Sequence, residues 1–393
     1  MHDEVVLAGA CRTAVGKYGG ALAGTPVVDL GAAVIREALF RAGVAPEQVD
    51  EAHMGCILPA GQMQNVARQA AVKAGLPVHS SASTLNIACG SGLQSVNMAA
   101  SLIRTGQAEL VVAGGMENMS RVPYALDKAR FGYRMGDGTL CDLMIHDSLW
   151  DAFNNYHMGI TAENVAEKYG ISREMQDAFA AESQQKCEAA TLAGRFKEEI
   201  VPLKLPAKKG ELLFERDEYP RGGVTVESLA ALKPAFKKDG TVTAGNASGI
   251  NDGAAAVVVM RAAKARELGI KPLARWVGSA TCGVDPAIMG IGPAASTQKL
   301  LRRLGLGMGD IDLIEANEAF AAQALAVGKL LEWDPATVNV NGGALAIGHP
   351  VGASGCRVLT TLLYEMRRRD ARRGLATLCI GGGMGISAVV ELL

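Results

Sequence analysis

Short apolar runs rich in β-branched residues alternate along this chain with alanine-rich stretches of helical character. In the first part, "VVLAGA" from Val5 and "AELVVAGG" from Ala108 are typical of strands, whereas "DLGAAVIREALFRAG" from Asp29 and "SGLQSVNMAASLIRTG" from Ser91 are typical of helices. Such alternation predicts βαβ units around a mostly parallel sheet, which is an α/β fold.

The same order of elements returns near the C-terminus. "VDEAHMG" from Val49 aligns with "IDLIEAN" from Ile311, and "AGGMENMS" from Ala113 aligns with "IGGGMGIS" from Ile380, with an "SG" pair between the aligned segments in each half. Each match covers few letters. Several elements in one order nevertheless favour an internal duplication into two halves of similar topology.

An overlay of the two halves also predicts an insertion in the first. In the second half the glycine turn leads at once into a closing strand, whereas in the first half more than a hundred residues separate the turn from "DGAAAVVVM" at Asp252. We therefore expect an N-terminal half formed by residues 1–120 with 252–270, an inserted lobe of residues 121–251, and a C-terminal half of residues 271–393. A surface excursion of that size, rich in lysine and arginine, is a candidate binding lobe.

The composition excludes several classes of function. The chain carries 39 basic and 40 acidic side chains, and because nucleic-acid-binding proteins usually have a clear basic excess, no nucleic acid partner is expected. No apolar run approaches the roughly 18 residues of a membrane helix, and the first residues lack the order of a signal peptide. We expect a cytoplasmic protein with no membrane partner. The eight cysteines include no C-x-x-C pair, so neither a disulfide framework nor a metal site is predicted.

The segment "NIACGSGLQS" places Cys89 among small residues just before the helix expected from Ser91. Unpaired N–H groups and the positive end of a helix dipole would favour a thiolate there. A helix end supplies at best about 2 kcal/mol, whereas lowering a thiol pKa by two units requires about 2.7 kcal/mol. A nucleophile at this position would therefore need a second activator such as histidine. The alternative is a buried structural cysteine.

Three polar residues lie at ends of predicted elements in the second half. His349, in "NGGALAIGHPVGASG", lies on a Gly-Pro loop before a helix and mirrors Cys89, so pseudo-twofold packing of the halves would bring the two helix starts together; it could also simply cap the loop. Cys379, in "CIGGGMG", follows a strand and precedes glycines whose N–H groups could hold a negative oxygen; the alternative is a core cysteine. Asn317 lies between a strand and a helix, where it could cap the helix or hold a water or a carbonyl oxygen.

Together, "NIACGSGLQS", "NEAF", "GGALAIGHPVGASG" and "CIGGGMG" resemble the motifs of the thiolase family, and within it the short-chain, biosynthetic acetyl-CoA C-acetyltransferases. The resemblance extends over essentially the whole chain. It implies a thiolase-like fold of duplicated βαβαβ halves with mixed sheets and layered helices. It also implies a Claisen condensation of two acetyl-CoA to acetoacetyl-CoA and CoA, with the reverse thiolysis, through an acetyl-Cys89 intermediate.

The resemblance implies a role for each catalytic residue. His349 would assist ionisation of Cys89, and Cys379 would take a proton from the α-carbon of a second acetyl-CoA. The backbone N–H groups of Cys89 and Gly381 would bind the oxyanion, and one such donor is worth about 2.7–4 kcal/mol. His349 and a water held by Asn317 would stabilise the enolate oxygen. No cofactor and no metal are implied, because the CoA thioesters are substrates.

The resemblance also implies a binding site for coenzyme A. Arg221 and neighbouring lysines would meet the phosphates or the adenine, and Ser248 would bond the pantetheine amide. The remaining wall of the tunnel would consist of His157, Met158, Leu149, Phe236, Ala244 and Phe320. Residues 124–147 resemble the oligomerisation loop of the family, which implies a homotetramer built as a dimer of dimers.

Three alternatives remain open. A β-ketoacyl synthase of the same fold would pair its cysteine with two histidines, whereas this chain has Cys379 where a second imidazole would be expected. A non-catalytic acyl-CoA-binding protein would have no need of all four catalytic positions. A 3-ketoacyl-CoA thiolase of broader chain length is the third alternative.

Overall fold

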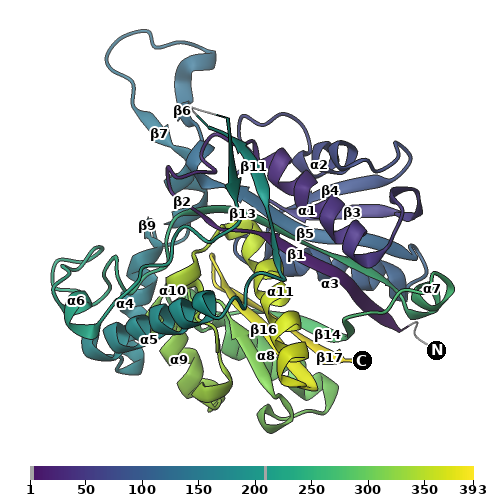
Figure 1. Ribbon diagram of the computed structural model, residues 1–393. Helices are drawn as coiled ribbons and strands as arrows, with labels where there is room; N and C mark the ends of the chain where they lie inside the picture. Colours follow the sequence, from purple (N-terminus) through teal and green to yellow (C-terminus); the bar gives the residue numbers. More distant parts are fainter. Residues whose placement is uncertain (1–3, 208–209) are drawn as a thin grey trace.

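The computed structural model describes residues 4–207 and 210–393, and its centre is one large mixed sheet (Figure 1). The main strands of this sheet are β1 (Val5–Thr13), β3 (Glu51–Gly55), β4 (Ser81–Leu85), β5 (Leu110–Asn118), β13 (Asn251–Arg261), β14 (Ala274–Gly283), β15 (Leu313–Ala316), β16 (Arg373–Ile380) and β17 (Met384–Leu392). They follow the order β15-β16-β17-β14-β1-β13-β5-β3-β4, with β2 (Gly16–Lys17) and β10 (Ile200–Val201) added beside β13 and β1.

Along this nine-strand path, neighbouring strands run antiparallel through the middle of the sheet and parallel near its two edges, and the added strand β10 is parallel to β1. β3 is parallel to β4 and β5, and β15 is parallel to β16, while every other pair along the path is antiparallel. The prediction of a mostly parallel sheet is therefore wrong, whereas the mixed sheet implied by the family resemblance is confirmed. Apart from the consecutive strands β16 and β17, the antiparallel pairs along this path join strands that are distant in sequence, such as β5 and β13 with Asp252 opposite Asn118.

The strand order repeats on either side of the contact between β1 and β14. On one side lie β1, β13, β5 and β3, and on the other lie β14, β17, β16 and β15. The two halves join through a short register of two pairs, Val6 with Arg275 and Leu7 with Ala274. This repetition agrees with the duplication predicted from the sequence.

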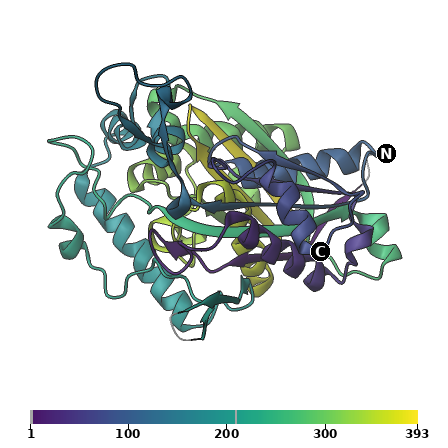
Figure 2. The same cartoon turned by 90° about the horizontal axis from the view of Figure 1, so that it is seen from above.

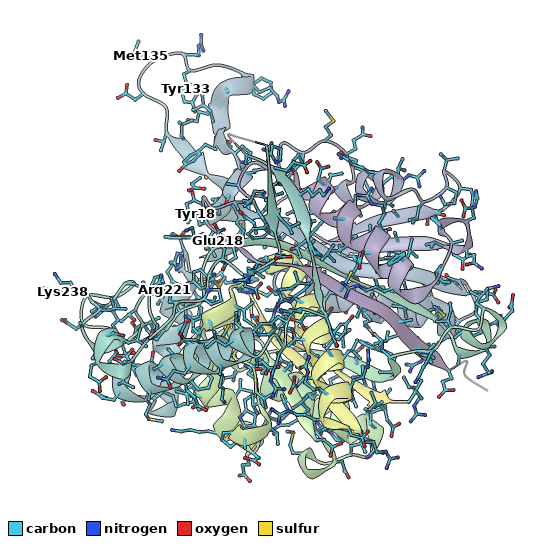
Figure 3. All side chains as sticks on the ribbon, viewed as in Figure 1. Tyr18, Tyr133, Met135, Glu218, Arg221 and Lys238 are labelled. Carbon is cyan, nitrogen blue, oxygen red and sulfur yellow. The ribbon has the colours of Figure 1, made fainter. Side chains whose placement is uncertain are left out.

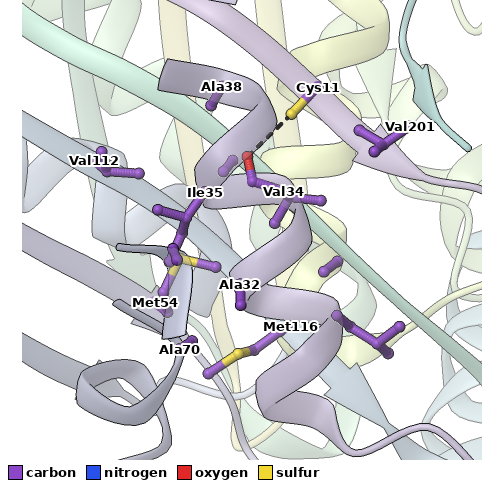
Figure 4. Close-up of a cluster of buried hydrophobic side chains, with 14 of the residues drawn as sticks. Cys11, Ala32, Val34, Ile35, Ala38, Met54, Ala70, Val112, Met116 and Val201 are labelled. Carbon is purple, nitrogen blue, oxygen red and sulfur yellow. Dashed lines mark hydrogen bonds between the residues drawn. The ribbon is translucent and has the colours of Figure 1, made fainter. Parts of the chain in front are cut away.

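Helices cover both faces of the sheet, and alternate strand residues face different layers. Val6 and Ala8 of β1 pack in the core beneath α1, whereas Val5 and Leu7 face the core shared by α3 and α11. In the first core, shown in Figure 4, the Cys11 thiol donates to the carbonyl of Val34 on α1 at 3.3 Å. The helices are α1 (Val27–Ala42), α2 (Val66–Ala74), α3 (Ser91–Arg104), α4 (Met158–Tyr169), α5 (Arg173–Leu192), α6 (Val226–Ala230), α7 (Ala262–Glu267), α8 (Gly292–Leu304), α9 (Ala321–Leu331), α10 (Ala344–Ile347) and α11 (Val351–Arg369).

The first turns of α3 and α11 touch each other through glycines. A Cβ added to Gly92 would lie 2.9 Å from the carbonyl oxygen of Gly352, so neither helix could keep its position with a larger residue there. Because Cys89 directly precedes α3 and His349 directly precedes α11, this contact brings both residues to one place. The facing helix starts predicted from the duplication are confirmed.

Apart from β10, the segment between β5 and β13 forms helices and short hairpins outside the main sheet, and much of it lies to one side of the sheet in Figure 2. Besides α4 to α6, it includes the hairpins β6 (Tyr124–Leu126) with β7 (Leu140–Asp142), β8 (Trp150–Asp151) with β9 (Tyr156–His157), and β11 (Leu203–Pro206) with β12 (Glu211–Phe214). The bounds given above for the two halves and the lobe stay a prediction. Among the residues placed in the structure, no helix is long and apolar enough to cross a membrane.

Candidate active site

A cavity of about 660 Å³ lies where the two halves and the inserted segment meet. Cys89, His349 and Gly381 line it, as do all eight residues predicted for the CoA site: Arg221, Ser248, His157, Met158, Leu149, Phe236, Ala244 and Phe320. Cys379 and Asn317 do not line the cavity. Both are buried behind its wall.

Cys89 is held by a sharp turn between β4 and α3. Ala88 adopts a left-handed conformation with φ of 48°, which costs a non-glycine residue about 1–3 kcal/mol. The turn is closed by side chains: the Ser91 hydroxyl accepts the N–H of Ile87 at 2.9 Å, and Asn86 Oδ1 accepts the N–H of Ala88 at 3.0 Å. This strained strand-turn-helix connection presents Cys89 to the cavity at the start of the helix, as predicted.

Burial raises the pKa of the Cys89 thiol to about 11. The backbone N–H groups of Gly381 and of Cys89 itself act in the opposite direction, because they donate toward the sulfur. Cys89 is partly buried and packs against apolar side chains that include Ile57 and Val351, and this desolvation outweighs the donors. As expected from the magnitudes, the helix start alone does not produce a thiolate, and burial favours the neutral thiol of Cys89 at neutral pH.

His349 is fixed at both ring nitrogens. Nδ1 lies 2.6 Å from the Ser354 hydroxyl, which in turn lies 2.9 Å from the carbonyl oxygen of Pro350. Because a carbonyl only accepts, the hydroxyl donates to Pro350 and accepts from Nδ1–H, which leaves a lone pair on Nε2. Burial, assisted by the cationic Arg357, lowers the pKa of His349 to about 3. The imidazole is therefore a neutral base with Nε2 as its acceptor.

Asn317 lies next to this imidazole. Its Nδ2 is 3.4 Å from His349 Nε2, and the side chain is 1% exposed. Its Oδ1 is buried and accepts no hydrogen bond from any described residue, so the site suits a small donor such as water. Phe320 rather than Asn317 occupies the N-cap position of α9, so the helix-capping interpretation is wrong.

Cys379 lies near the end of β16, one residue before the strand stops. It is fully buried in an apolar cluster with Met158, Met289 and Phe320. Burial raises the pKa of its thiol far above the usual range, and the neighbouring Cys89 raises that pKa further. The glycine turn that follows brings the N–H of Gly381 to the Cys89 sulfur. The two sulfurs and this donor therefore form one compact group.

Aromatic rings line the cavity between this group and its mouth. The His157 ring stacks on Phe236 with centroids 4.7 Å apart, and the Phe236 ring meets Phe320 edge-on at 6.2 Å. At the mouth the guanidinium of Arg221 lies 5.9 Å from the ring centroid of Tyr219. Figure 3 shows Arg221 and Glu218 near Tyr18, while Lys238 lies farther out. Among the described lysines, only Lys17 lines the cavity.

Sequence reasoning missed several residues of this site. Ser354 belongs to the "SG" pair that helped to align the two halves, and no role in the site was predicted for it. Its place in the first turn of the helix after His349 puts its hydroxyl within reach of the imidazole. Met289 and Tyr219 come from segments without any motif. Glu117 was missed as well, and its signal is an acidic residue inside the otherwise apolar strand β5.

Comparison with known proteins agrees with this geometry. The model of the thiolase N-terminal domain matches residues 5–263, and the model of the thiolase C-terminal domain matches residues 270–392. An acetyl-CoA acetyltransferase from Pseudomonas aeruginosa is 63% identical over 388 residues, covering 98% of each chain, and one from Cupriavidus necator is 61% identical over 389 residues, covering 99% of each.

Solved structures give the same result. The crystal structure of the Bacillus anthracis acetyl-CoA acetyltransferase superposes with a TM-score of 0.98 at 45% sequence identity, covering 100% of this chain and 99% of that one. The acetyl-CoA acetyltransferase from Syntrophomonas wolfei also gives a TM-score of 0.98, at 42% identity and with full coverage of both chains. The chain therefore has the thiolase fold and belongs to the thiolase family.

Proposed function

We propose that this protein is an acetyl-CoA C-acetyltransferase, which condenses two acetyl-CoA to acetoacetyl-CoA and CoA and catalyses the reverse thiolysis. The observation that carries the proposal is the compact group of a neutral Cys89 thiol, the Nε2 lone pair of His349 and the N–H of Gly381 on one wall of the cavity. The names of the relatives from Pseudomonas aeruginosa and Cupriavidus necator support the same activity.

In the first half-reaction Cys89 takes the acetyl group. His349 Nε2 accepts the thiol proton while the sulfur attacks the thioester carbonyl. The carbonyl oxygen accepts hydrogen bonds from the backbone N–H groups of Cys89 and Gly381. The tetrahedral intermediate collapses with loss of the CoA thiolate, and Cys379 gives that thiolate its proton. The products are acetyl-Cys89 and free CoA, with Cys379 now a thiolate and His349 protonated.

In the second half-reaction the Cys379 thiolate removes a proton from the methyl carbon of a second acetyl-CoA. Protonated His349 and a water held by Asn317 Oδ1 stabilise the enolate oxygen. The enolate carbon attacks the acetyl group, and the departing Cys89 sulfur recovers its proton from His349. All three side chains return to their neutral starting forms. The raised pKa of Cys379 suits this role, because a thiolate with a high pKa is a strong base.

The apolar cluster around Cys379 supports a short acyl chain. Met158, Met289 and Phe320 occupy the space beside the two sulfurs, which leaves room for an acetyl group more readily than for a long alkyl chain. A 3-ketoacyl-CoA thiolase of broader chain length would need that volume open. The same cysteine, in the place of a second histidine, argues against the β-ketoacyl synthase alternative.

The hairpin of β6 and β7 supports a homotetramer. It stands away from the body of the molecule in Figure 1 and carries the exposed apolar side chains of Tyr124, Phe131, Met135 and Leu140. We propose that these side chains are covered by other subunits, which light scattering on the purified protein tests directly. The eight free thiols suit a reducing compartment such as the cytoplasm.

Intact mass spectrometry after addition of acetyl-CoA tests the activity itself. The enzyme predicts one added acetyl group, mapped to Cys89 by digestion, and acetoacetyl-CoA among the products. A protein that binds acetyl-CoA but gains no mass would be the non-catalytic binding module instead.

A further inference from the structure

Glu117, near the end of β5, is a fully buried carboxylate that pairs with no cation among the described residues. Its Oε2 accepts the backbone N–H groups of Ile57 at 3.0 Å and Gly352 at 2.9 Å. Its Oε1 accepts the N–H of Leu58 at 3.2 Å and the Cys56 thiol at 3.5 Å. A charge is retained in a core only where such donors replace water.

These donors belong to the two sides of the active site. Ile57 lies in the loop after β3, in the apolar cluster against which Cys89 packs. Gly352 is the second residue of α11, three residues after His349. The fit is tight, because a Cβ on Gly352 would lie 2.6 Å from Glu117 Oε2. One side chain therefore joins the backbone beside the nucleophile to the helix that follows the base.

We propose that Glu117 is a positioning residue for acetyl transfer: it holds His349 in place relative to Cys89, and its negative charge behind the nucleophile further disfavours the Cys89 thiolate. This inference rests on the function proposed above. Glu117 contacts neither substrate nor the reacting atoms; it acts through the peptide N–H groups that it binds and through its field.

Among the described residues, Glu117 is the charged group that acts on the Cys89 thiol. Its carboxylate raises the pKa of the Cys89 thiol. The other titratable groups nearby are Cys56 and Cys379, whose thiols have raised pKa values, and His349, whose pKa is lowered. All three are uncharged at neutral pH. Burial raises the pKa of Glu117 itself to about 7, while the three backbone donors oppose that shift, so its charge grows as the pH rises through neutrality.

Two substitutions separate position from charge. Glu117→Gln keeps the size of the side chain and removes its charge, and it places an NH2 group, which cannot accept a hydrogen bond, against backbone N–H donors. We therefore expect acetylation of Cys89 to slow by about tenfold or more, with little change in KM for acetyl-CoA. Loss of the charge lowers the pKa of the Cys89 thiol, so iodoacetamide should alkylate Cys89 at least about twofold faster at pH 8, as followed by peptide mapping. Glu117→Asp keeps the charge but shortens the reach, so acetylation should slow while alkylation keeps the wild-type rate.

Glu199→Gln is the matched control. Glu199 is also a buried carboxylate, but it does not line the cavity, and its Oε1 lies 2.6 Å from Arg12 Nε. This variant should lower the melting temperature without changing alkylation of Cys89. If Glu117→Gln fails to melt cooperatively, Gly352→Ala tests the positioning role instead. The Cβ that this substitution adds would displace the Glu117 carboxylate, while Glu117 keeps its charge. Slow acetylation in that variant supports the positioning role.

Wild-type acetylation in Glu117→Gln or in Gly352→Ala would overturn the positioning role. Unchanged alkylation of Cys89 in Glu117→Gln would overturn the electrostatic one. The alkylation measurement needs no acetyl transfer. A wild-type protein that never acetylates, but whose alkylation rate responds to Glu117→Gln, would therefore refute the proposed function and leave the effect of the charge standing.

Discussion

Replacing Ser354 by alanine removes the only side-chain partner that His349 Nδ1 has among the residues placed in the structure. In the structure the Ser354 hydroxyl accepts Nδ1–H at 2.6 Å and donates to the carbonyl oxygen of Pro350 at 2.9 Å. His349 is only 6% exposed, so bulk water does not take the place of the hydroxyl. The variant therefore leaves a buried N–H without an acceptor, or else an imidazole that has moved its proton to Nε2, where it no longer serves as a base.

The size of the effect follows from the cost of that unmet hydrogen bond. A buried polar group left without its partner costs about 1–3 kcal/mol. Since about 1.4 kcal/mol corresponds to a tenfold change in rate, we expect acetylation of Cys89 to slow by roughly 10- to 100-fold. The KM for acetyl-CoA should change little, because the predicted CoA residues Arg221, Ser248 and Phe236 are not bonded to Ser354.

Single-turnover acetylation, stopped with acid and read by intact mass, measures this rate. Ser95→Ala is the matched control, because Ser95 is a buried serine of α3 whose hydroxyl bonds the carbonyl oxygens of Gly92 at 2.8 Å and Gly114 at 2.7 Å. It should lose stability and keep its acetylation rate. Acetylation of Ser354→Ala within twofold of the wild type would refute the assignment of Nε2 as the base.

Three further predictions follow from the same geometry. In Cys379→Ser, acetyl-Cys89 should still form, because protonated His349 can give its proton to the leaving CoA thiolate, while acetoacetyl-CoA formation falls by about 10²- to 10⁴-fold, because the base of the second half-reaction is lost; mass spectrometry and product assay separate the two steps. In Gly92→Ala, the Cβ would lie 2.9 Å from the carbonyl oxygen of Gly352, so the free energy of unfolding should fall by about 1–3 kcal/mol in urea titrations. Because the pKa of His349 is lowered to about 3 and that of Cys89 is raised to about 11, single-turnover acetylation in Glu117→Gln, which lacks the titration of Glu117, should be nearly constant from about pH 6 to about pH 9; a tenfold change in that range would contradict the neutral pair.

The elements of the fold could be predicted from the sequence, but the directions of its strands could not. Apolar runs and alanine-rich stretches predicted β1, α1 and α3 close to their observed bounds, because local pattern determines them. The direction of β13 against β5 depends on pairing across the inserted segment, with Asp252 opposite Asn118. An apolar run has the same letters in a parallel and in an antiparallel pair, so the mostly parallel sheet was predicted wrongly.

The residues of the site could be predicted better than their ionisation. Cys89 and His349 were predicted from glycine-flanked positions at ends of elements, Gly381 was implied by the resemblance to the thiolase family, and the structure places all three on one cavity. The raised pKa of Cys89 depends on burial by Ile57 and Val351, which lie in other segments of the chain. Desolvation of this kind arises only in the packed molecule, whereas the helix-end effect is visible in the sequence.

The account depends most on Cys89 being the acetyl carrier of the turnover reaction. Rapid-quench mixing with acetyl-CoA carrying a labelled acetyl group measures how fast label appears on Cys89 and how fast it leaves in acetoacetyl-CoA. We predict that acetyl-Cys89 forms at least as fast as kcat and disappears at the rate at which product forms. Label that reaches Cys89 more slowly than product accumulates, or that appears first on another residue, would contradict the account.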